Sequence, residues 1–265
     1  MREALLSARG IMKTFEKVFP KGFPKGFSGR HEKEQILKKI DVDIYAGDFT
    51  VIMGSSGAGK STLLYALSGM DAISDGSVKF KGKEISKLSE KQMAEFRANE
   101  FGFVFQQSHL VSSLSLLENV AVAGYLDSSR NAKEVRKKAA ELLDQMRVDT
   151  AKDRFLSEVS GGEAQRAVIA RAMINSPSIL FADEPTGALN KRNSEEVLNL
   201  FTGLNENGQS ILMVTHDIRA AIRGTRILYL EDGKILDEMT FPAFKEAEAR
   251  NRELLLSNWL NALSW

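Results

Sequence analysis

One short segment holds glycines, a lysine and a serine at the spacing of a phosphate-binding loop. It fits the pattern G-x-x-x-x-G-K-[ST] at every fixed position, between an apolar run at 49–53 and a helical pattern. In such a loop, backbone N–H groups and the N-terminus of the following helix face phosphate oxygens. Lys60 would place its charge on the β- and γ-phosphates, and Ser61 would hold Mg²⁺. The segment predicts a nucleoside triphosphate site made of Gly54, Ser55, Ser56, Gly57, Ala58, Gly59, Lys60, Ser61 and Thr62.

Two adjacent carboxylates end a second apolar run, at residues 178–182. Such a run is typical of a parallel strand that is covered on both faces. At the strand's carboxyl end, Asp183 would reach Mg²⁺ through a coordinated water, and Glu184 would orient or deprotonate the attacking water. Adjacent acids are often only a solvated turn, but a phosphate loop already requires a metal-binding aspartate on a neighbouring strand. The pair therefore predicts triphosphate hydrolysis.

A serine and two glycines precede a helical stretch at 167–174 and form a second candidate phosphate-binding nest. One nucleotide does not need two nests from one chain, roughly 100 residues apart, unless the second serves a partner's nucleotide. Residues 159–166 resemble the LSGGQ signature motif of ATP-binding-cassette (ABC) ATPases, with Val159 and Glu163 in place of Leu and Gln. We expect the Glu163 carboxylate to point away from the phosphates. The resemblance implies that the nucleotide contacts come from Ser160, Gly161 and Gly162.

Residues 103–106 form a strand that ends in an amide and resemble the Q-loop of the same family. The resemblance implies that Gln106 contacts Mg²⁺ or the attacking water and joins the core to a helical subdomain. Gln107 is adjacent, and the position within the motif favours Gln106.

Residues 212–217 form another strand with a histidine at its end and resemble the family's switch segment. A lone histidine at a strand end is more often structural, but its place after the other cassette elements favours a functional role. The resemblance implies that His216 hydrogen-bonds the γ-phosphate. Residues 187–190 resemble the D-loop, with Asn190 where the family usually has Asp.

The resemblance covers nearly the whole chain and implies both a fold and an assembly. The fold would be α/β, a phosphate-loop (RecA-like) core with an antiparallel β subdomain and a helical subdomain inserted at about 107–170. Residues 1–265 would form a single ABC ATPase domain with a C-terminal amphipathic helix at about 244–265. Two copies would sandwich two ATP molecules, each between Lys60 of one chain and Ser160 of the other.

Composition narrows the class of protein. The chain has 265 residues, of which 43% are apolar, and can bury a substantial core. Its 36 basic and 35 acidic residues give a net charge of +1, so we expect no general attraction to nucleic acid. The absence of cysteine excludes disulfides and fits a reducing cytosol. We find no signal peptide and no apolar window long enough to span a membrane, so a transport pore would belong to another chain.

A proline- and glycine-rich segment at 19–27 contains F-P-K-G twice and interrupts the first strands. We expect an exposed loop, which is either a mobile hairpin or a basic, aromatic contact with lipid headgroups or a partner. Phe15 stands where the family places an aromatic residue that stacks on adenine. Phe19 is the competing candidate, and we favour Phe15.

Two apolar segments could meet partners. Residues 108–117 resemble the family's groove for a permease coupling helix, although their leucines could instead fill the core of the helical lobe. The tail is rich in leucine and tryptophan from Leu254 to Trp265. We expect it to pack on its own core or across a dimer, and contact with a membrane surface is the alternative.

Three functions compete. The favoured one is the ATPase subunit of an ABC transporter, peripheral on the cytoplasmic membrane face, which powers export or extraction of a hydrophobic or peptide/lipid-like substrate through an integral-membrane permease. The alternative drives a permease-like partner that regulates cell-envelope hydrolases without transport. The third, a soluble DNA-maintenance ATPase, would need long coiled coils between the phosphate loop and the signature. Only roughly 100 residues separate the two motifs here, which disfavours this class. Residues 103–106, 117–120 and 182–187 look most like the lipoprotein-releasing, macrolide-exporting and antimicrobial-peptide-resistance branch.

Overall fold

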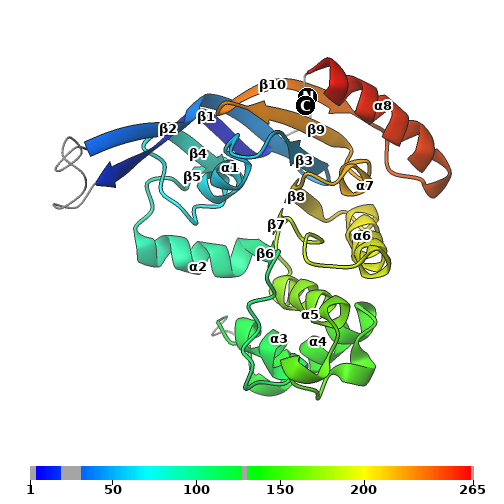
Figure 1. Cartoon of the computed structure of the whole chain (residues 1–265). Coiled ribbons are helices and arrows are strands. Elements are labelled where there is room, and N and C mark those ends of the chain that lie inside the picture. The colour runs from blue at the N-terminus through cyan, green and yellow to red at the C-terminus, as the bar shows by residue number, and fades with distance from the viewer. Residues whose placement is uncertain (1–3, 19–30, 127–129, 264–265) are drawn as a thin grey trace, which may run out of the picture.

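A six-stranded sheet forms the centre of the computed structural model, which describes residues 4–18, 31–126 and 130–263 (Figure 1). The strand order is β10–β9–β3–β8–β7–β6, and every neighbouring pair is parallel except β9 and β10. The parallel strands end at one edge, where the predicted site residues stand. The bounds are β3 Phe49–Met53, β6 Phe101–Phe105, β7 Ile179–Asp183, β8 Ser210–Val214, β9 Arg226–Glu231 and β10 Lys234–Thr240.

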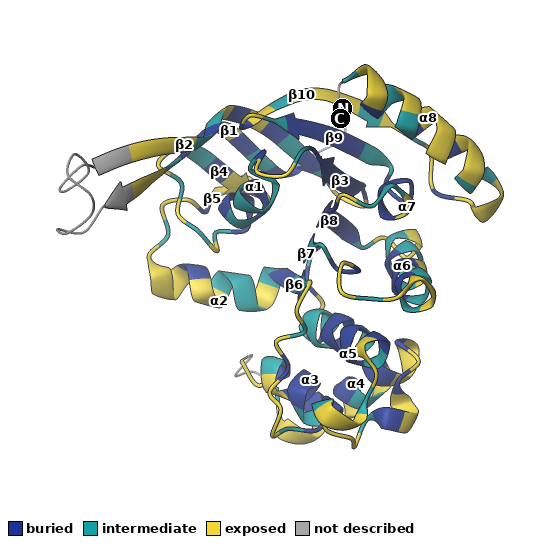
Figure 2. Ribbon diagram, viewed as in Figure 1, coloured by how far each residue is buried: buried dark blue, intermediate teal, exposed yellow. Residues whose placement is uncertain are grey.

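Successive residues of the central strands belong to two separate cores, one on each face of the sheet. Strands β3, β8 and β9 are buried along nearly their whole length (Figure 2). In β3, Val51 and Met53 join one core and Ile52 joins the other. Side chains alternate along a strand, so a strand covered on both faces needs an unbroken apolar sequence. One face carries α1 (Lys60–Leu67) and α2 (Glu90–Glu100), and the other carries α6 (Lys191–Glu206), α7 (Ile218–Ala221) and α8 (Ala249–Ala262).

A helical lobe projects from the end of β6 (Figure 1). The lobe's α4 buries Val135, Ala139 and Leu143 at helical spacing, which is typical of an amphipathic helix. Its helices are α3 (Leu116–Gly124), α4 (Ala132–Gln145) and α5 (Gly161–Met173), with short 3₁₀ turns at Asp149–Ala151 and Leu156–Glu158. A further 3₁₀ turn, Glu246–Glu248, leads into α8. Within the described residues, no helix is both long and apolar enough to cross a membrane.

The second sheet is antiparallel, with strand order β2–β1–β4–β5, and packs over α1. Its two long strands form a hairpin that extends away from the body of the molecule (Figure 1). The segment expected to form a loop at 19–27, with Phe19, lies outside the described residues. The bounds are β1 Ala4–Val18, β2 His31–Tyr45, β4 Asp75–Phe80 and β5 Lys83–Glu84.

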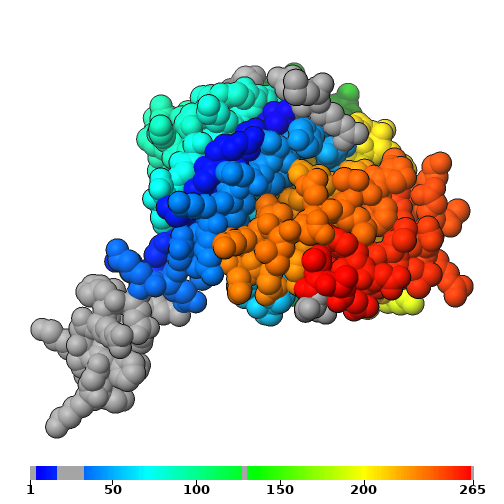
Figure 3. Space-filling model, turned by 90° about the horizontal axis from the view of Figure 1, so that it is seen from above, coloured from blue at the N-terminus to red at the C-terminus, as the bar shows by residue number. Residues whose placement is uncertain are grey.

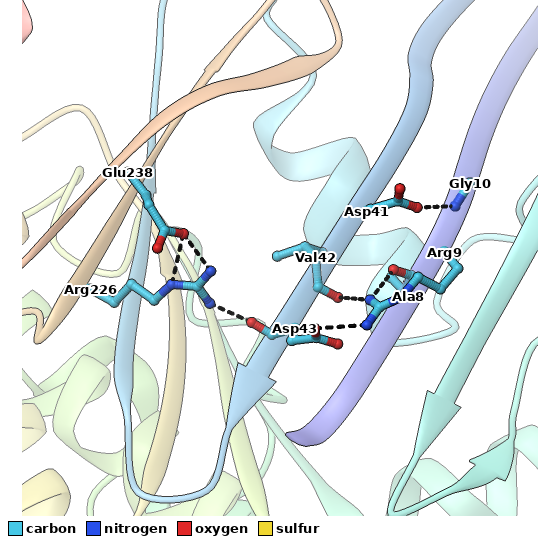
Figure 4. Close-up of polar contacts among 8 residues, drawn as sticks. All are labelled: Ala8, Arg9, Gly10, Asp41, Val42, Asp43, Arg226 and Glu238. Atoms are coloured by element: carbon cyan, nitrogen blue, oxygen red, sulfur yellow. Dashed lines mark hydrogen bonds and ion pairs between the residues drawn. The ribbon is translucent and has the colours of Figure 1, made fainter. Parts of the chain in front are cut away.

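Arg226 joins the antiparallel sheet to the edge of the central sheet, and Arg9 joins two strands within the antiparallel sheet (Figure 4). Arg226 on β9 donates to Glu238 Oε2 on β10 at 2.5 Å and to the backbone carbonyl of Asp43 on β2. Arg9 on β1 donates to Asp43 Oδ2 at 2.7 Å, and this hydrogen bond lowers the pKa of the Asp43 carboxyl. Strand β2 is thereby fixed to the outer strands β9 and β10 of the central sheet.

The C-terminal helix α8 lies along β9 and β10 (Figure 3). Leu256 and Leu260 are fully buried, and the Trp259 indole donates to Asp237 Oδ2 at 2.9 Å. The inner face of the tail therefore packs on the chain's own core, one of the two expected arrangements. Leu254 and Leu255 point outward and are about half exposed.

Candidate functional site

The phosphate loop connects β3 to α1, as the sequence predicts. Gly54 has φ +151°, and a Cβ at this position would lie 1.9 Å from the Leu230 carbonyl oxygen. No other residue fits so close to neighbouring backbone. Lys60 Nζ curls over its own loop and donates to the carbonyl oxygens of Gly54 at 2.9 Å and Ser55 at 2.8 Å. The ammonium group is thus held at the loop, where it would meet phosphate.

The β9–β10 hairpin braces the phosphate loop from behind. Its Gly233 N–H donates to the Ala58 carbonyl at 3.1 Å. The Ser55 hydroxyl donates to Glu231 Oε1 at 2.8 Å, and the Tyr229 hydroxyl donates to Glu231 Oε2 at 3.1 Å. The hydrogen bond from Ser55 lowers the pKa of Glu231. An Asp-Gly turn joins β9 to β10, but no local pattern in the sequence indicates that Glu231 reaches a loop so far away along the chain.

A hydroxyl and a carboxylate meet where the sequence predicts a metal site. Ser61 Oγ, at the start of α1, donates to Asp183 Oδ1 at 2.8 Å. Tyr65, one turn along α1, donates from its hydroxyl to Asp183 Oδ2 at 2.6 Å. Burial and this hydrogen bond raise the pKa of Tyr65. The oxygen donors of Ser61 and Asp183 fit Mg²⁺, which takes few protein ligands and completes its shell with phosphates and waters. Sequence reasoning missed Tyr65.

The two adjacent acids at the end of β7, Asp183 and Glu184, point to different partners. Asp183 faces α1, whereas Glu184 Oε1 lies 2.8 Å from His216 Nδ1 at the end of β8. Thr215 Oγ1 donates to Glu184 Oε2 at 3.3 Å. Glu184 has φ +47°, an uncommon value for a residue with a side chain, and its N–H donates to the Val214 carbonyl at 2.9 Å. The backbone turn directs the two adjacent carboxylates to different sides, Asp183 toward α1 and Glu184 toward the end of β8.

Gln106 and the predicted D-loop lie side by side. Gln106 follows the last residue of β6 and is exposed. A Cβ on Gly187 would lie 3.0 Å from the Gln106 Nε2 atom, so this glycine leaves room for the amide. Asn190 begins α6 as its N-cap and accepts from the Asn193 N–H at 2.9 Å, a role that Asn fills as well as Asp.

A cleft of about 490 Å³ opens beside the predicted catalytic residues Glu184 and His216. Its lining brings together the ends of β7 and β8, the D-loop and one residue of α8, and includes Glu184, Thr186, Gly187, His216, Arg219 and Glu253. Glu184 and His216 thus line a cleft with room for a water molecule, an arrangement that activation of water requires.

The signature segment begins α5, with Ser160 as its N-cap. Glu163 Oε2 accepts from the Ser160 N–H at 2.8 Å and from Ser160 Oγ at 2.7 Å, which lowers the pKa of Glu163. The Glu163 carboxylate therefore lies beside Ser160 at the N-terminus of α5. The third residue of a helix is well placed to cap the first turn, and a carboxylate there also meets the positive end of the helix dipole. Ser160 and Gly161 are exposed, whereas Gly162 is buried against Asn193.

Phe15 lies on β1 near the phosphate loop. Lys13 pairs with Leu37 on β2, and the Leu37 side chain lies 3.2 Å from where a Gly59 Cβ would stand. Phe15 is two residues farther along the strand, 42% exposed, with Lys13 Nζ 4.8 Å from its ring centroid. An exposed ring at this position is available for a base to stack on.

Most leucines of the segment 108–117 fill the core of the helical lobe, the second of the two arrangements that the sequence allows. Leu110, Leu116 and Leu117 are buried in the core of the helical lobe, and only Val111 is about half exposed. The reason is the capping box of Ser115 and Glu118, which starts α3 and turns the two following leucines inward.

A different hollow, of about 310 Å³, lies between α2, the end of β6 and the helical lobe. Its rim includes exposed Met70 and Leu126, the latter 69% exposed. Aromatic and basic side chains line it, including Phe103, Phe105, Arg97 and Arg171.

The fold and the site define a phosphate-loop nucleoside triphosphatase, because a parallel sheet presents the loop, the Asp183–Ser61 pair and Glu184 at one edge. A family model described as ABC transporter matches residues 37–187. The chain belongs to the ABC transporter family and is an ATPase of that family.

Relatives carry names from the branch that the sequence resembles. The chain is 40% identical over 208 residues to the bacitracin export ATP-binding protein BceA of Halalkalibacterium halodurans, covering 78% of this chain and 82% of that protein. It is 43% identical over 206 residues to the lipoprotein-releasing system ATP-binding protein LolD of Aquifex aeolicus, covering 78% and 92%. The macrolide export ATP-binding/permease protein MacB of Mannheimia succiniciproducens is 43% identical over 204 residues, but the chain spans only 31% of its length.

Solved structures agree on the fold. The dimeric post-hydrolysis cassette MJ0796 bound to ADP and Pi is 33% identical, with a TM-score of 0.77 over 90% of this chain and 100% of that one. The predicted α/β phosphate-loop fold and the family resemblance are confirmed.

Proposed function

We propose that the chain hydrolyses ATP to power export or extraction of a hydrophobic, peptide-like or lipid-like substrate through a separate integral-membrane permease. The observation that carries the proposal is the convergence of Lys60, the Ser61–Asp183 pair and the Glu184–His216 pair at one sheet edge. Catalysis of phosphoryl transfer to water is chiefly positioning and charge neutralisation, which these groups supply.

Each group has one task. Lys60 neutralises the β- and γ-phosphates, and Phe15 stacks on the adenine. The Ser61 hydroxyl and the Asp183 carboxylate hold Mg²⁺, which when bound neutralises charge on the phosphate oxygens. Glu184 orients and deprotonates the attacking water, with His216 beside it to bond the γ-phosphate. Gln106 reaches the same centre from β6.

A second copy of the chain completes the site. Ser160 and Gly161 are exposed at the N-terminus of α5, ready to meet phosphate held by the partner's Lys60. The dimeric form of the related cassette MJ0796 supports this arrangement. Closing and opening of this homodimer is the mechanical output.

The permease docks in the hollow beside β6, which places the chain peripherally on the cytoplasmic face of the membrane. The exposed apolar side chains of Met70 and Leu126 lie at the rim of this hollow, and two arginines line it. Apolar and basic groups side by side are suited to binding an amphipathic helix. The names of BceA, LolD and MacB support export or extraction as the output. A permease-like partner that regulates cell-envelope hydrolases is the second candidate.

Deletion of the gene separates the two candidates. A transporter subunit predicts altered sensitivity to peptide antibiotics or macrolides, or retention of lipoproteins in the inner membrane, restored by the parent chain but not by Glu184→Gln. A hydrolase regulator predicts chains of undivided cells and unchanged sensitivity. Normal sensitivity, normal lipoprotein release and normal division together would contradict both.

A further inference from the structure

Helix α5 holds the catalytic loops of its own chain through one buried amide. Gln165 is 3% exposed, and its Nε2 donates to the Phe105 carbonyl at 2.9 Å and to the Pro185 carbonyl at 2.8 Å. Phe105 directly precedes Gln106, and Pro185 directly follows Glu184. A single side chain thus joins the backbone on either side of two predicted catalytic residues.

Both donor hydrogens of the Gln165 amide are used. A buried carbonyl that loses its hydrogen-bond donor carries the full free-energy cost of desolvation. The Gln165 amide therefore stabilises the Phe105 and Pro185 carbonyls in their present positions. Pairing between β6 and β7 extends only as far as Phe105 and Asp183, so beyond these residues the sheet no longer joins the two loops to each other.

Other side chains of α5 extend the same support. Arg171 donates to the carbonyls of Ser108 and His109 at 2.9 and 2.8 Å, farther along the Q-loop. Arg166 pairs with Glu196 on α6 at 2.7 Å. The helix is therefore fixed to the Q-loop and to the helix that follows the D-loop, with Gln165 at the centre.

We propose that Gln165 is a positioning residue that sets the register of Gln106 and Glu184 against the signature helix of the same chain. The inference rests on the proposed hydrolysis of ATP at this site. It adds a consequence for the dimer: α5 begins at Ser160, which meets the nucleotide held by the partner, and the same helix fixes the water-activating loop of its own site. Engagement of one nucleotide is thereby connected through a rigid helix to catalysis at the other.

The test uses the full-length chain with Gln165→Met, which keeps the volume of the side chain and removes both donors. Gln165→Asn shortens the side chain by one methylene and withdraws the amide from both carbonyls. It replaces the Met variant in the test if that variant does not fold. Gln145→Met, at the exposed end of α4, is the matched control. We expect kcat to fall about 10- to 100-fold, because small displacements of catalytic groups are costly, with KM for ATP within about twofold. Equal loss in the control, or a rise in KM with unchanged kcat, would overturn the proposal.

Heterodimers of differently tagged chains locate the effect. One chain carries Glu184→Gln, so a single site turns over. Gln165→Met in the chain with the intact Glu184 should lower turnover as in the homodimer. The same substitution in the Glu184→Gln chain, which supplies Ser160 to the working site, should leave turnover within about twofold. A larger loss in the second arrangement would mean that Gln165 acts on the signature end of α5, contrary to the proposal. Failure of the proposed function is distinct, because the parent chain itself would then not hydrolyse ATP.

Discussion

The carboxylate of Glu184 and the imidazole of His216 form one unit, with Oε1 and Nδ1 2.8 Å apart across the ends of β7 and β8. If Nδ1 carries the hydrogen of this bond, the neutral ring presents Nε2 as an acceptor. The imidazolium form donates from both nitrogens and can bond the carboxylate and a phosphate oxygen together. In the mechanism proposed above, the pair would therefore link water activation to the presence of the γ-phosphate.

Glu184→Gln keeps the shape of the side chain and removes the base. We expect ATP to bind and the dimer to persist, with hydrolysis reduced by about 100-fold or more. Gel filtration with ATP and a phosphate-release assay measure both. Turnover within a fewfold of the parent would contradict the role of Glu184.

Lys60→Ala and Ser160→Arg chains should complement each other. Each homodimer has two damaged sites, but the mixed dimer keeps one intact composite site, formed by Lys60 of one chain and Ser160 of the other. Turnover in the mixture should therefore exceed that of either variant alone. If heterodimers form and turnover does not rise, each chain completes its own site.

Glu163→Gln should strengthen the ATP-dependent dimer. The Glu163 carboxylate accepts both hydrogen bonds of Ser160 and places a negative charge where a partner's phosphate would arrive. Removing one partly screened charge should raise dimer affinity by about fivefold. Sedimentation at several ATP concentrations in the Glu184→Gln background measures it, and weaker association would show that the carboxylate instead helps to order Ser160.

Glu231→Gln should change how stability depends on pH. The pKa of Glu231 is lowered in the folded chain by the hydrogen bond from Ser55, so its contribution is present above the ordinary glutamate pKa and is lost as pH falls through the lowered value. The parent should therefore be more stable than the variant at neutral pH, and the difference should shrink on acidification. Denaturant melts at several pH values test this, and a difference independent of pH would contradict it.

Leu126→Asp should abolish co-purification with the permease and leave the isolated chain stable, because Leu126 is exposed at the rim of the hollow beside β6. Leu255→Asp, exposed on α8, is the matched control. Leu110→Asp should instead lower the melting temperature, since it places a charge in the helical-lobe core. A normal membrane complex with Leu126→Asp would place the docking surface elsewhere.

The sequence was sufficient to predict the elements that depend on contiguous residues. The phosphate loop, the apolar strands that end in Asp183 and His216, and the Asp-Gly hairpin each depend on neighbours along the chain. Contacts between distant elements were not predictable in the same way. Gln165 meets a carbonyl 60 residues away and Ser55 meets a carboxylate 176 residues away, and each depends on how helices and strands pack.

The surroundings of Leu110 and Glu163 were not predictable from the sequence for a related reason. The side chain of Leu110 packs in the core of the helical lobe, with α3 and α4, and the direction of Glu163 is set by the first turn of α5. Both depend on where a helix begins, which sequence patterns locate only approximately. Roles in catalysis stay predictions until the variants are measured.

The bracing of the phosphate loop by the β9–β10 turn constrains the order in which the protein can mature on the ribosome. Gly54 packs against the Leu230 carbonyl, and the Ala58 carbonyl accepts a hydrogen bond from the Gly233 N–H. The phosphate loop is therefore supported by residues that are synthesised much later than the loop itself. The β3 strand is likewise placed between β8 and β9, which are made late. Synthesis proceeds at about 5–20 residues per second, so the loop exists for many seconds as a nascent segment without its support. A nascent chain stalled before Gly233 should therefore not retain ATP, whereas one released after β10 should.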